Sequence, residues 1–258
     1  MSIIKNFRVD GEGLAKPALF CYYIPMTYQE LQDEVETNII DLPAAVLAKV
    51  PTYVKRAVKT IQTRHNFKVM ETEQTYNTVL STRSIGSVPS NFKEWRLDPF
   101  FLDDEGVWRK IILAPNVSAI RQSHIDNDDT GYPLFLLESD ASTEANASTL
   151  SVYPLPDGNS DFDDGEYRIY VPYVKYLTAL SASGDSNWFT VNADEYIINL
   201  ATSYGFAADW DEQRMGIWAQ LAENKFKEIV KRDNLYRLSG VDTLVPHYQG
   251  VNEARTRM

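Results

Sequence analysis

The chain has 258 residues, a formal net charge of -11 and 44% hydrophobic residues, which is the composition of a globular protein. Its acidic excess argues against a general duplex-binding surface, because neutralising phosphates requires clustered cations. No apolar run reaches the roughly 18–20 residues of a bilayer span, and the first residues lack the apolar segment of a secretory signal. We therefore expect no membrane association, and assembly in the cytoplasm. Cys21 is the only cysteine, so no intrachain disulfide can form.

An arm and then helices are predicted for the first part of the chain. Residues 1–26 show no sustained periodicity and are expected to form an extended N-terminal arm. Thr27 and Glu30 have the spacing of a capping box, in which a hydroxyl and a carboxylate bind the first free amides of a helix. Apolar residues then recur at helical intervals, which predicts a helical part over residues 27–66.

The stretch PTYVKRAVKTIQTRHNF (residues 51–67) is basic, and two interpretations compete for it. One face carries Val54, Ala57, Val58 and Ile61, and the rest of the surface carries Lys55, Arg56 and Lys59. A helix that reads DNA normally has a helix-turn-helix frame and a second basic element beside it, and the neighbouring residues supply neither. We expect the apolar face to pack and the cations to meet an acidic neighbour or solvent.

The middle of the chain, residues 67–190, has the alternation and the turn residues of a β-rich region. Residues 103–106 (DDEG) are predicted to form a hairpin turn, residues 116–125 a short helix, and residues 140–148 and 157–166 exposed loops. The candidate strands are KVMETEQTYNTV, FKEWRLDPFFL, VWRKIILAP, YPLFLLES, TLSVYPLP and YRIYVPYVK.

Helical periodicity returns in residues 191–234, with one helix capped by Asn192 and a longer one from about Asp211 to Asn234. Residues 235–258 lack periodicity and are expected to form an extended C-terminal tail. The order of helices, strands and helices predicts an α+β fold. We expect a helical bundle built from the N- and C-terminal helices, with a β-rich central insertion and extended termini, as one globular domain.

No motif of the chain supports catalysis or cofactor binding. Walker A, GxGxxG and GxSxG patterns are absent, and His65, His124 and His247 lie far apart with no zinc-type spacing. A surface or partly buried polar role is the favoured interpretation of these histidines. We therefore expect a protein without enzymatic activity, cofactor or bound metal.

One acidic loop leaves a weak calcium hypothesis open. Asp157, Asn159 and Asp161 occupy positions 1, 3 and 5 of an EF-hand-like loop. Phe162 stands at position 6 in place of glycine, and Arg168 at position 12 in place of glutamate. A solvated acidic turn is the favoured interpretation, and a loose site of oxygen ligands is the alternative.

A second basic segment, residues 225–237, indicates how copies of the chain meet. Two basic helices on an acidic protein favour charge complementarity between neighbouring subunits or with partner proteins. The predicted subunit-interface residues are Lys55, Arg56, Lys59, Lys227, Lys231 and Arg232.

Four segments, taken in order, carry the pattern of a known protein family. They are VPTYVKRAVKTIQTRHNF, then IGSVPSNFKEWRL, then TGYPLFLLES with TLSVYPLPD, and finally YRIYVPYVKYLTALSASGDSNWFTVNADEYIINLA. In this order they resemble an early helix, a turn into the first central strand, a strand pair, and a last strand with the penultimate helix. Over about residues 27–234 the chain thus resembles the head-to-tail adaptor (connector, or head-completion) proteins of tailed bacteriophages.

The resemblance implies a non-enzymatic structural protein of the virion neck, assembled in the host cytoplasm. Such adaptors form a twelvefold ring beneath the portal protein, receive the tail or nozzle on the other side, and let genomic DNA pass without specific binding. Their C-terminal segments reach the portal protein, a role that here falls to residues 235–258. The implied portal-binding residues are Leu235, Tyr236, Arg237, Leu244, Val245, Tyr248, Arg255 and Arg257.

Two other classes of function stay open at this point. The β-rich middle and the aromatic residues would suit a tail-associated carbohydrate-binding or hydrolytic component, whose signature is a carboxylate pair in an open groove. A DNA-packaging factor would also carry basic helices, and strong salt-dependent duplex binding would be its signature.

Overall fold

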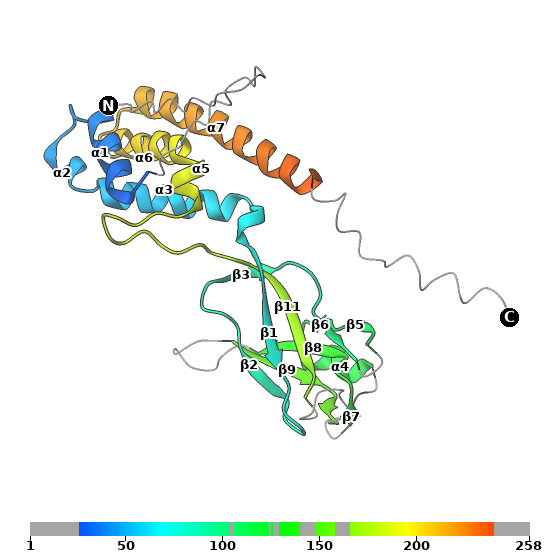
Figure 1. Ribbon diagram of the computed structural model, residues 1–258. Coiled ribbons are helices and arrows are strands. Elements are labelled where there is room, and N and C mark those ends of the chain that lie inside the picture. Colours follow the sequence, from blue (N-terminus) through cyan, green and yellow to red (C-terminus); the bar gives the residue numbers. More distant parts are fainter. Residues whose placement is uncertain are drawn as a thin grey trace, which may run out of the picture.

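The structure is a computed structural model of the chain, and it describes residues 26–103, 106–123, 125, 129–139, 148–157 and 166–239. The described residues form seven α-helices and several β-sheets, which confirms the predicted mixed α+β class. Figure 1 shows a helical body (residues 26–70 and 176–239) and a β-rich body (residues 71–175). Among the described residues, no helix combines the length and the hydropathy of a bilayer span.

The first helices are α1 (Tyr28–Asn38), α2 (Ala44–Leu47) and α3 (Val50–Arg64), followed by the short 3-10 helix η1 (Lys68–Met70). The predicted capping box is confirmed, because Thr27 Oγ1 accepts from the N–H of Glu30 and Glu30 Oε2 accepts from the N–H of Thr27 at 2.7 Å. The predicted apolar face of α3 is buried, and it consists of Val54, Ala57, Val58 and Ile61.

The second group of helices is α5 (Trp188–Asn192), α6 (Asp194–Ala208) and α7 (Glu212–Ser239). Helix α6 lies at the centre of the helical body, since it contacts α1, α2, α3, α5 and α7. Both ends of the described chain therefore share one hydrophobic core. Its largest fully buried side chains include Phe67, Phe189, Tyr196, Leu31, Ile39 and Ile61.

The prediction that Asn192 caps the penultimate helix is wrong, because the N-cap of α6 is Ala193 and Asn192 belongs to α5, which begins four residues earlier at Trp188. Asn187 caps α5, and its carboxamide oxygen accepts from the N–H groups of Phe189 and Thr190 at 2.9 and 3.3 Å. Asn192 is consequently the last residue of α5, and its Nδ2 donates to the carbonyl of Trp188 at 3.0 Å.

The last helix ends later than the sequence predicts. Helix α7 runs to Ser239, whereas the apolar periodicity stops near Asn234, so residues from Leu235 to Ser239 are helical instead of extended. Tertiary contacts explain the extra turn, because the side chain of Arg237 is bonded to Glu71 at the start of β1. Residues 240–258 of the predicted tail lie outside the described residues.

The first sheet of the β-rich body has β11 (Arg168–Lys175) at its centre. Strand β1 (Glu71–Asn77) pairs with it along its whole length, from Glu71 opposite Val174 to Asn77 opposite Arg168. The other strands of this sheet are β3 (Phe92–Trp95), β4 (Phe100–Leu102) and β5 (Trp108–Lys110).

The second sheet packs against the first. Its strands, in spatial order, are β2 (Ser84–Ser87), β9 (Thr149–Tyr153), β8 (Phe135–Ser139) and β6 (Ile112–Ala114). A separate short pair is β7 (Thr130–Gly131) with β10 (Leu155–Pro156), and α4 (Val117–Gln122) follows β6. The shared core contains Phe101, Ile169 and Val171 from the first sheet and Leu136, Leu150 and Val152 from the second.

Several predicted strands divide in two. FKEWRLDPFFL forms β3 and β4 around a break that contains Pro99, which has no N–H for a ladder. VWRKIILAP forms β5 and β6 in different sheets on either side of the buried Ile111, and TLSVYPLP forms β9 and β10. The predicted hairpin turn is confirmed, because β4 and β5 are antiparallel and the N–H of Gly106 donates to the carbonyl of Asp103 at 3.0 Å.

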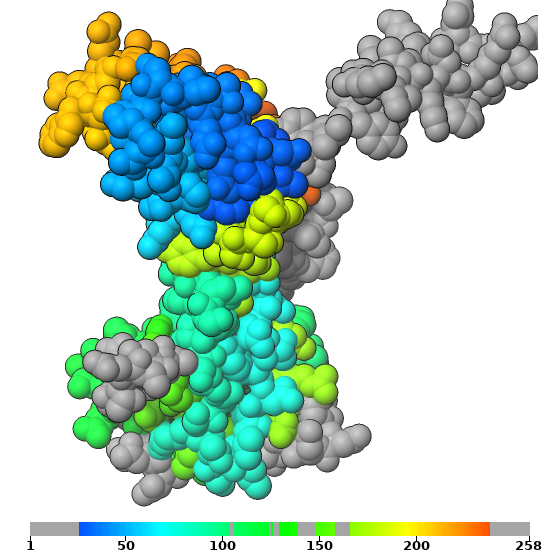
Figure 2. Space-filling model, turned by 90° about the vertical axis from the view of Figure 1, so that its left-hand side faces the viewer, coloured from blue at the N-terminus to red at the C-terminus, as the bar shows by residue number. Residues whose placement is uncertain are grey.

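The two bodies are joined by a narrower region, which Figure 2 shows between the helical body above and the β-rich body below. Two segments cross it. One runs from α3 through η1 into β1, and the other leads from β11 through residues 176–187 to α5. The relative placement of the bodies therefore depends on side-chain contacts at this crossing.

Two helical glycines provide a matched test of the close packing between α1 and α6. Replacing Gly216, whose added Cβ would meet nothing within 4 Å, with alanine should stabilise the fold by about 0.5–1 kcal/mol. At Gly205 the added Cβ would lie 2.9 Å from Ile39 Cδ1, so crowding should offset the same gain. Denaturant unfolding measures both changes, and equal stabilisation by the two variants would contradict this packing.

Candidate functional site

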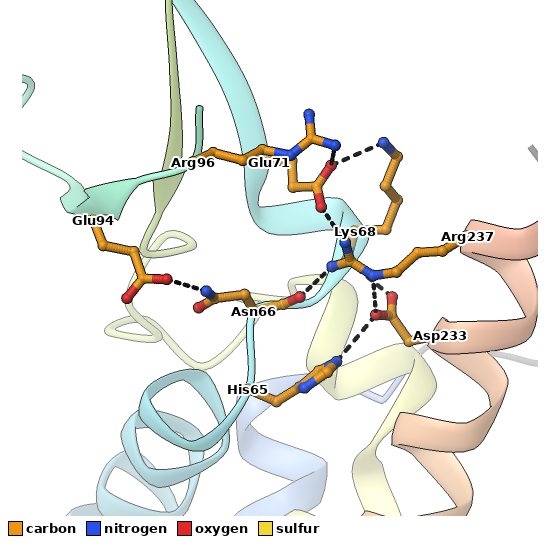
Figure 3. Close-up of polar contacts among 8 residues, drawn as sticks. All are labelled: His65, Asn66, Lys68, Glu71, Glu94, Arg96, Asp233 and Arg237. Atoms are coloured by element: carbon orange, nitrogen blue, oxygen red, sulfur yellow. Dashed lines mark hydrogen bonds and ion pairs between the residues drawn. The ribbon is translucent and has the colours of Figure 1, made fainter. Parts of the chain in front are cut away.

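Side chains from distant parts of the chain meet where the helical body joins the β-rich body, as Figure 3 shows. The end of α3, the segment η1–β1, the end of β3 and the last turns of α7 all contribute to this cluster. We call it the junction network. Its residues are His65, Asn66, Lys68, Glu71, Glu94, Arg96, Asp233 and Arg237.

Asp233 of α7 is one of two buried anions in the network, with a side chain 4% exposed. Its Oδ1 accepts from the N–H of Lys68 at 2.9 Å, and its Oδ2 lies 3.1 Å from His65 Nε2 and 2.9 Å from Arg237 Nε. Burial alone would raise the pKa of Asp233, but the hydrogen bonds from these three residues outweigh burial and hold the pKa below its ordinary value. In its carboxylate form, Asp233 therefore links α7 to the segment that follows α3.

Glu71 at the start of β1 is the other buried anion, with a side chain 6% exposed. Lys68 Nζ and Arg96 Nη2 each lie 2.8 Å from its Oε2, and Arg237 donates to its Oε1. Removing a carboxylate from water is costly, and the surrounding cations offset that cost. Arg237 links the two anions, since it also donates to Asp233.

Asn66 and Lys93 extend the bonding to β3. Asn66 Nδ2 donates to Glu94, and its Oδ1 accepts from Lys93 Nζ at 2.6 Å. Burial lowers the pKa of Lys93, which also donates to the carbonyl of Gln62 on α3. Gln62 Oε1 in turn accepts from the N–H of Leu177 at 2.7 Å. Strand β3 and the segment that follows β11 are thus both bonded to the end of α3.

The arrangement of these side chains suits a structural role, in which they hold the two bodies together. Its buried carboxylates are occupied by donors from the protein itself, although part of the network lines an open depression of about 640 Å³. Within the part of the chain that the structure describes, no three His, Cys, Asp or Glu side chains gather so as to hold a metal ion. The geometry fixes the direction in which α7 ends, and with it the point from which residues 240–258 depart.

The predicted portal-binding residues have different positions. Leu235 and Tyr236 lie on the exposed side of the last turns of α7, at 58% and 68% exposure. Arg237 turns inward and is engaged in the junction network, which sequence periodicity did not indicate. The remaining candidates lie outside the described residues, and they are Leu244, Val245, Tyr248, Arg255 and Arg257.

Some predicted subunit-interface cations already have aromatic neighbours within the chain. Lys55 Nζ lies 5.6 Å from the ring centroid of Tyr28, and the guanidinium carbon of Arg56 lies 4.3 Å from that of Tyr204. Such cation–π contacts leave part of each cation open to solvent. Both residues are exposed, so contact with a neighbouring subunit stays a prediction.

The other predicted interface cations lie at three places on the helical body. Lys59 borders a groove beside Leu177 and Leu180. Arg232 donates to the carbonyl of Asn192 at 2.6 Å, which ties α7 to the end of α5. The two remaining residues, Lys227 and Lys231, line a shallow depression on α7.

The calcium hypothesis gains no support from the described residues. Asp157 accepts a hydrogen bond from the hydroxyl of Tyr167 at 2.6 Å. His65 is half-buried and bonded to Asp233, which agrees with the polar role favoured for it. The remaining residues of the calcium loop, Asn159 and Asp161, lie outside the described residues. The same holds for the other two histidines, His124 and His247.

Sequence reasoning missed the junction network. The bonds from Asp233 to Lys68 and from Arg237 to Asn66 join residues 165 and 171 positions apart, so no local pattern indicates them. The available signal was the i, i+4 spacing of Asp233 and Arg237, which favours an ion pair on one helical face. That spacing predicts a helix reaching residue 237, and the structure contains one.

Replacing Asp233 with alanine tests the network. The fold should lose about 1–3 kcal/mol of stability, because the partly buried N–H of Lys68 and part of Arg237 lose their acceptor. Denaturant unfolding measures this loss, and amide exchange in residues 233–239 should accelerate. Lys231→Ala removes an exposed charge from the same helix and should change stability by less than about 0.5 kcal/mol. Equal effects of the two variants would contradict the role of the network.

The low pKa of Asp233 predicts a pH dependence. The pKa of Asp233 is lower in the folded chain than in the unfolded chain, where it is about 3.9. Such a carboxyl stabilises the fold at pH values above its unfolded pKa. It loses this effect as pH falls through its folded pKa. The stability difference between the wild-type chain and Asp233→Asn should therefore shrink as pH falls from about 5 to about 3. Urea unfolding across this range measures it, and a constant difference would show that the carboxylate is not the fastening group.

A comparison with known protein families adds an independent finding. The chain matches the SU10 adaptor protein family over residues 26–244, a range that includes both bodies and the junction network. A search of curated proteins finds no match. The family match confirms the resemblance to phage head-to-tail adaptors that the four sequence segments carry. The chain belongs to the SU10 adaptor protein family.

Proposed function

We propose that the protein forms a ring beneath the portal protein in the virion neck, where it joins the DNA-filled capsid to the tail. The observation that carries the proposal is the match to an adaptor family across both bodies. The form of the molecule supports it, because the two bodies and the narrow junction between them (Figure 2) offer separate surfaces to partners. In this proposal the protein acts by fitting against other proteins and catalyses no reaction.

The end of α7 is assigned to the portal side. Asp233 and Arg237 hold the last turns of this helix in one direction, and Leu235 and Tyr236 expose apolar surface beside them. Residues 240–258 follow this fixed point and add Arg255 and Arg257, which suit contact with an acidic partner. The β-rich body is then assigned to the tail or nozzle protein.

The ring itself places two demands on each subunit. A closed ring of identical copies needs two different, complementary faces on every chain. We assign twelve copies to the ring, as the resemblance to phage adaptors implies. Genomic DNA must also slide through the channel that the ring lines. A chain with net charge -11 suits that task, since like charge discourages phosphates from binding to the wall.

A carbohydrate-binding tail component is the second candidate, and one observation favours it. Phe100, Trp108 and Tyr170 form an aromatic cluster on the first sheet, and Trp108 is 48% exposed. However, Trp108 packs edge-on against the other two rings, with centroids 5.2 and 5.3 Å away, so part of its surface is already used. The adaptor function is supported by the family match as well, and we prefer it.

Removing residues 240–258 tests the portal assignment. The truncated chain should keep its unfolding transition, because the junction network ends at Arg237, and should lose docking to purified portal rings as seen by electron microscopy. A control chain carries a Gly/Ser segment of equal length in place of these residues and should also fail to dock. Docking of the truncated chain at full affinity would show that portal binding lies elsewhere.

A further inference from the structure

The turn between α6 and α7 has an unusual residue at its centre. The N–H of Trp210 donates to the carbonyl of Ala207 at 3.3 Å, and the N–H of Asp211 donates to the carbonyl of Phe206 at 3.0 Å. These two bonds are those of a Schellman motif, in which the residue after the C-cap adopts a left-handed conformation. Glycine normally occupies that position, and here it is Trp210, with φ of 60°.

Trp210 is also almost fully exposed, at 88%. A bulky residue with positive φ is a backbone outlier, and a tryptophan in solvent leaves a large apolar surface in contact with water. Neither feature helps the isolated chain to fold. Strain of this kind persists at functional positions when the surroundings hold it in place.

The surroundings hold this turn firmly. Asp211 Oδ1 accepts from the N–H of Arg214 at 2.9 Å and so caps the start of α7. The guanidinium of Arg214 binds both Asp211 and Asp41 of the α1–α2 turn, and its central carbon lies 4.3 Å from the ring centroid of Phe206. Trp210 is therefore presented on a rigid base, which lowers the entropy cost of ordering it on binding.

The surface around Trp210 is apolar with an acidic edge. Ile217 and Leu221 follow on α7 at helical spacing and are 53% and 43% exposed. Asp209 and Glu212, on either side of Trp210, are exposed as well. We call these five residues the Trp210 knob. In Figure 2 the α6–α7 turn, coloured gold, protrudes from the upper end of the helical body.

A complementary surface lies on the same chain. A groove of about 550 Å³ runs between α3 and the segment after β11, and its apolar lining includes Val58, Leu177 and Leu180. Lys55 and Lys59 border it and give it a basic edge. Helix α6 contacts both α3 and α7 and lies between them in Figure 1, so the knob and the groove are on different sides of the helical body.

We propose that the Trp210 knob of one subunit inserts into the Lys55–Lys59 groove of the next copy of this chain. Each subunit then uses one surface as donor and the other as acceptor, which is the head-to-tail contact that a closed ring requires. The apolar parts of both surfaces become buried, and the acidic edge meets the basic edge. This inference rests on the proposed ring, and it identifies the partner of Lys55 and Lys59.

Trp210→Gly tests the knob without harming the fold. Glycine suits the left-handed position, so the thermal unfolding midpoint of the monomer should rise by about 2–4 °C. Ring formation on purified portal, followed by electron microscopy and native mass spectrometry, should weaken by about 30-fold or more, as for a central interface tryptophan. Gly216→Ala, also on this end of α7, is the control and should assemble like the wild-type chain.

Charge reversal tests the groove. Asp209→Lys/Glu212→Lys should fail to assemble alone, and so should Lys55→Glu/Lys59→Glu, because each places like charges at every contact. An equimolar mixture of the two should form rings in which the variants alternate. Failure of the mixture, or rings formed by Trp210→Gly as well as by the wild-type chain, overturns this interface alone.

Two further outcomes are decisive. If the wild-type chain forms no ring on portal, both the proposed function and this interface are wrong. If Trp210→Gly forms normal rings that no longer bind a tail protein, the knob serves that protein, and the contact between copies is refuted.

Discussion

The ion pairs of Arg237 with Asp233 and Glu71 are the contacts on which the arrangement of the molecule depends. They join the last helix to the first strand across 166 positions of sequence, and they bury two carboxylates with their donors. Buried ion pairs contribute little net stability compared with apolar packing, but they fix geometry, because a displaced charge would be left unpaired. Here the geometry that they fix is the angle between the helical body and the β-rich body.

This fixed geometry suits the proposed adaptor function. In the proposed function the protein contacts the portal on one side and the tail on the other, so its surfaces must keep a constant relation to one another. The helical body carries the Lys55–Lys59 groove beside α3 and the Trp210 knob at the turn after α6. Helix α7 ends close to the junction network. Helices α3 and α7 each carry a group of cations on this acidic chain, so opposite charges on different sides can set both the partner and the register of contact.

Local patterns predicted the local features of this structure. The capping box of Thr27 and Glu30, the apolar face of α3 and the turn after Asp103 depend on near neighbours and were visible in the sequence. The division of VWRKIILAP between two sheets depends on which distant strands pair with each half. The junction network depends on contacts between segments far apart in the chain, and Trp210 breaks the glycine rule for its turn, so neither could be read from periodicity.

The most direct measurement is electron cryomicroscopy of intact virions that contain this protein, with the density between capsid and tail compared with the fold. The account predicts a ring of identical copies at that junction, each with its α7 end toward the capsid and its β-rich body toward the tail. Density for the fold at another place in the particle, or its absence from the neck, would contradict the account.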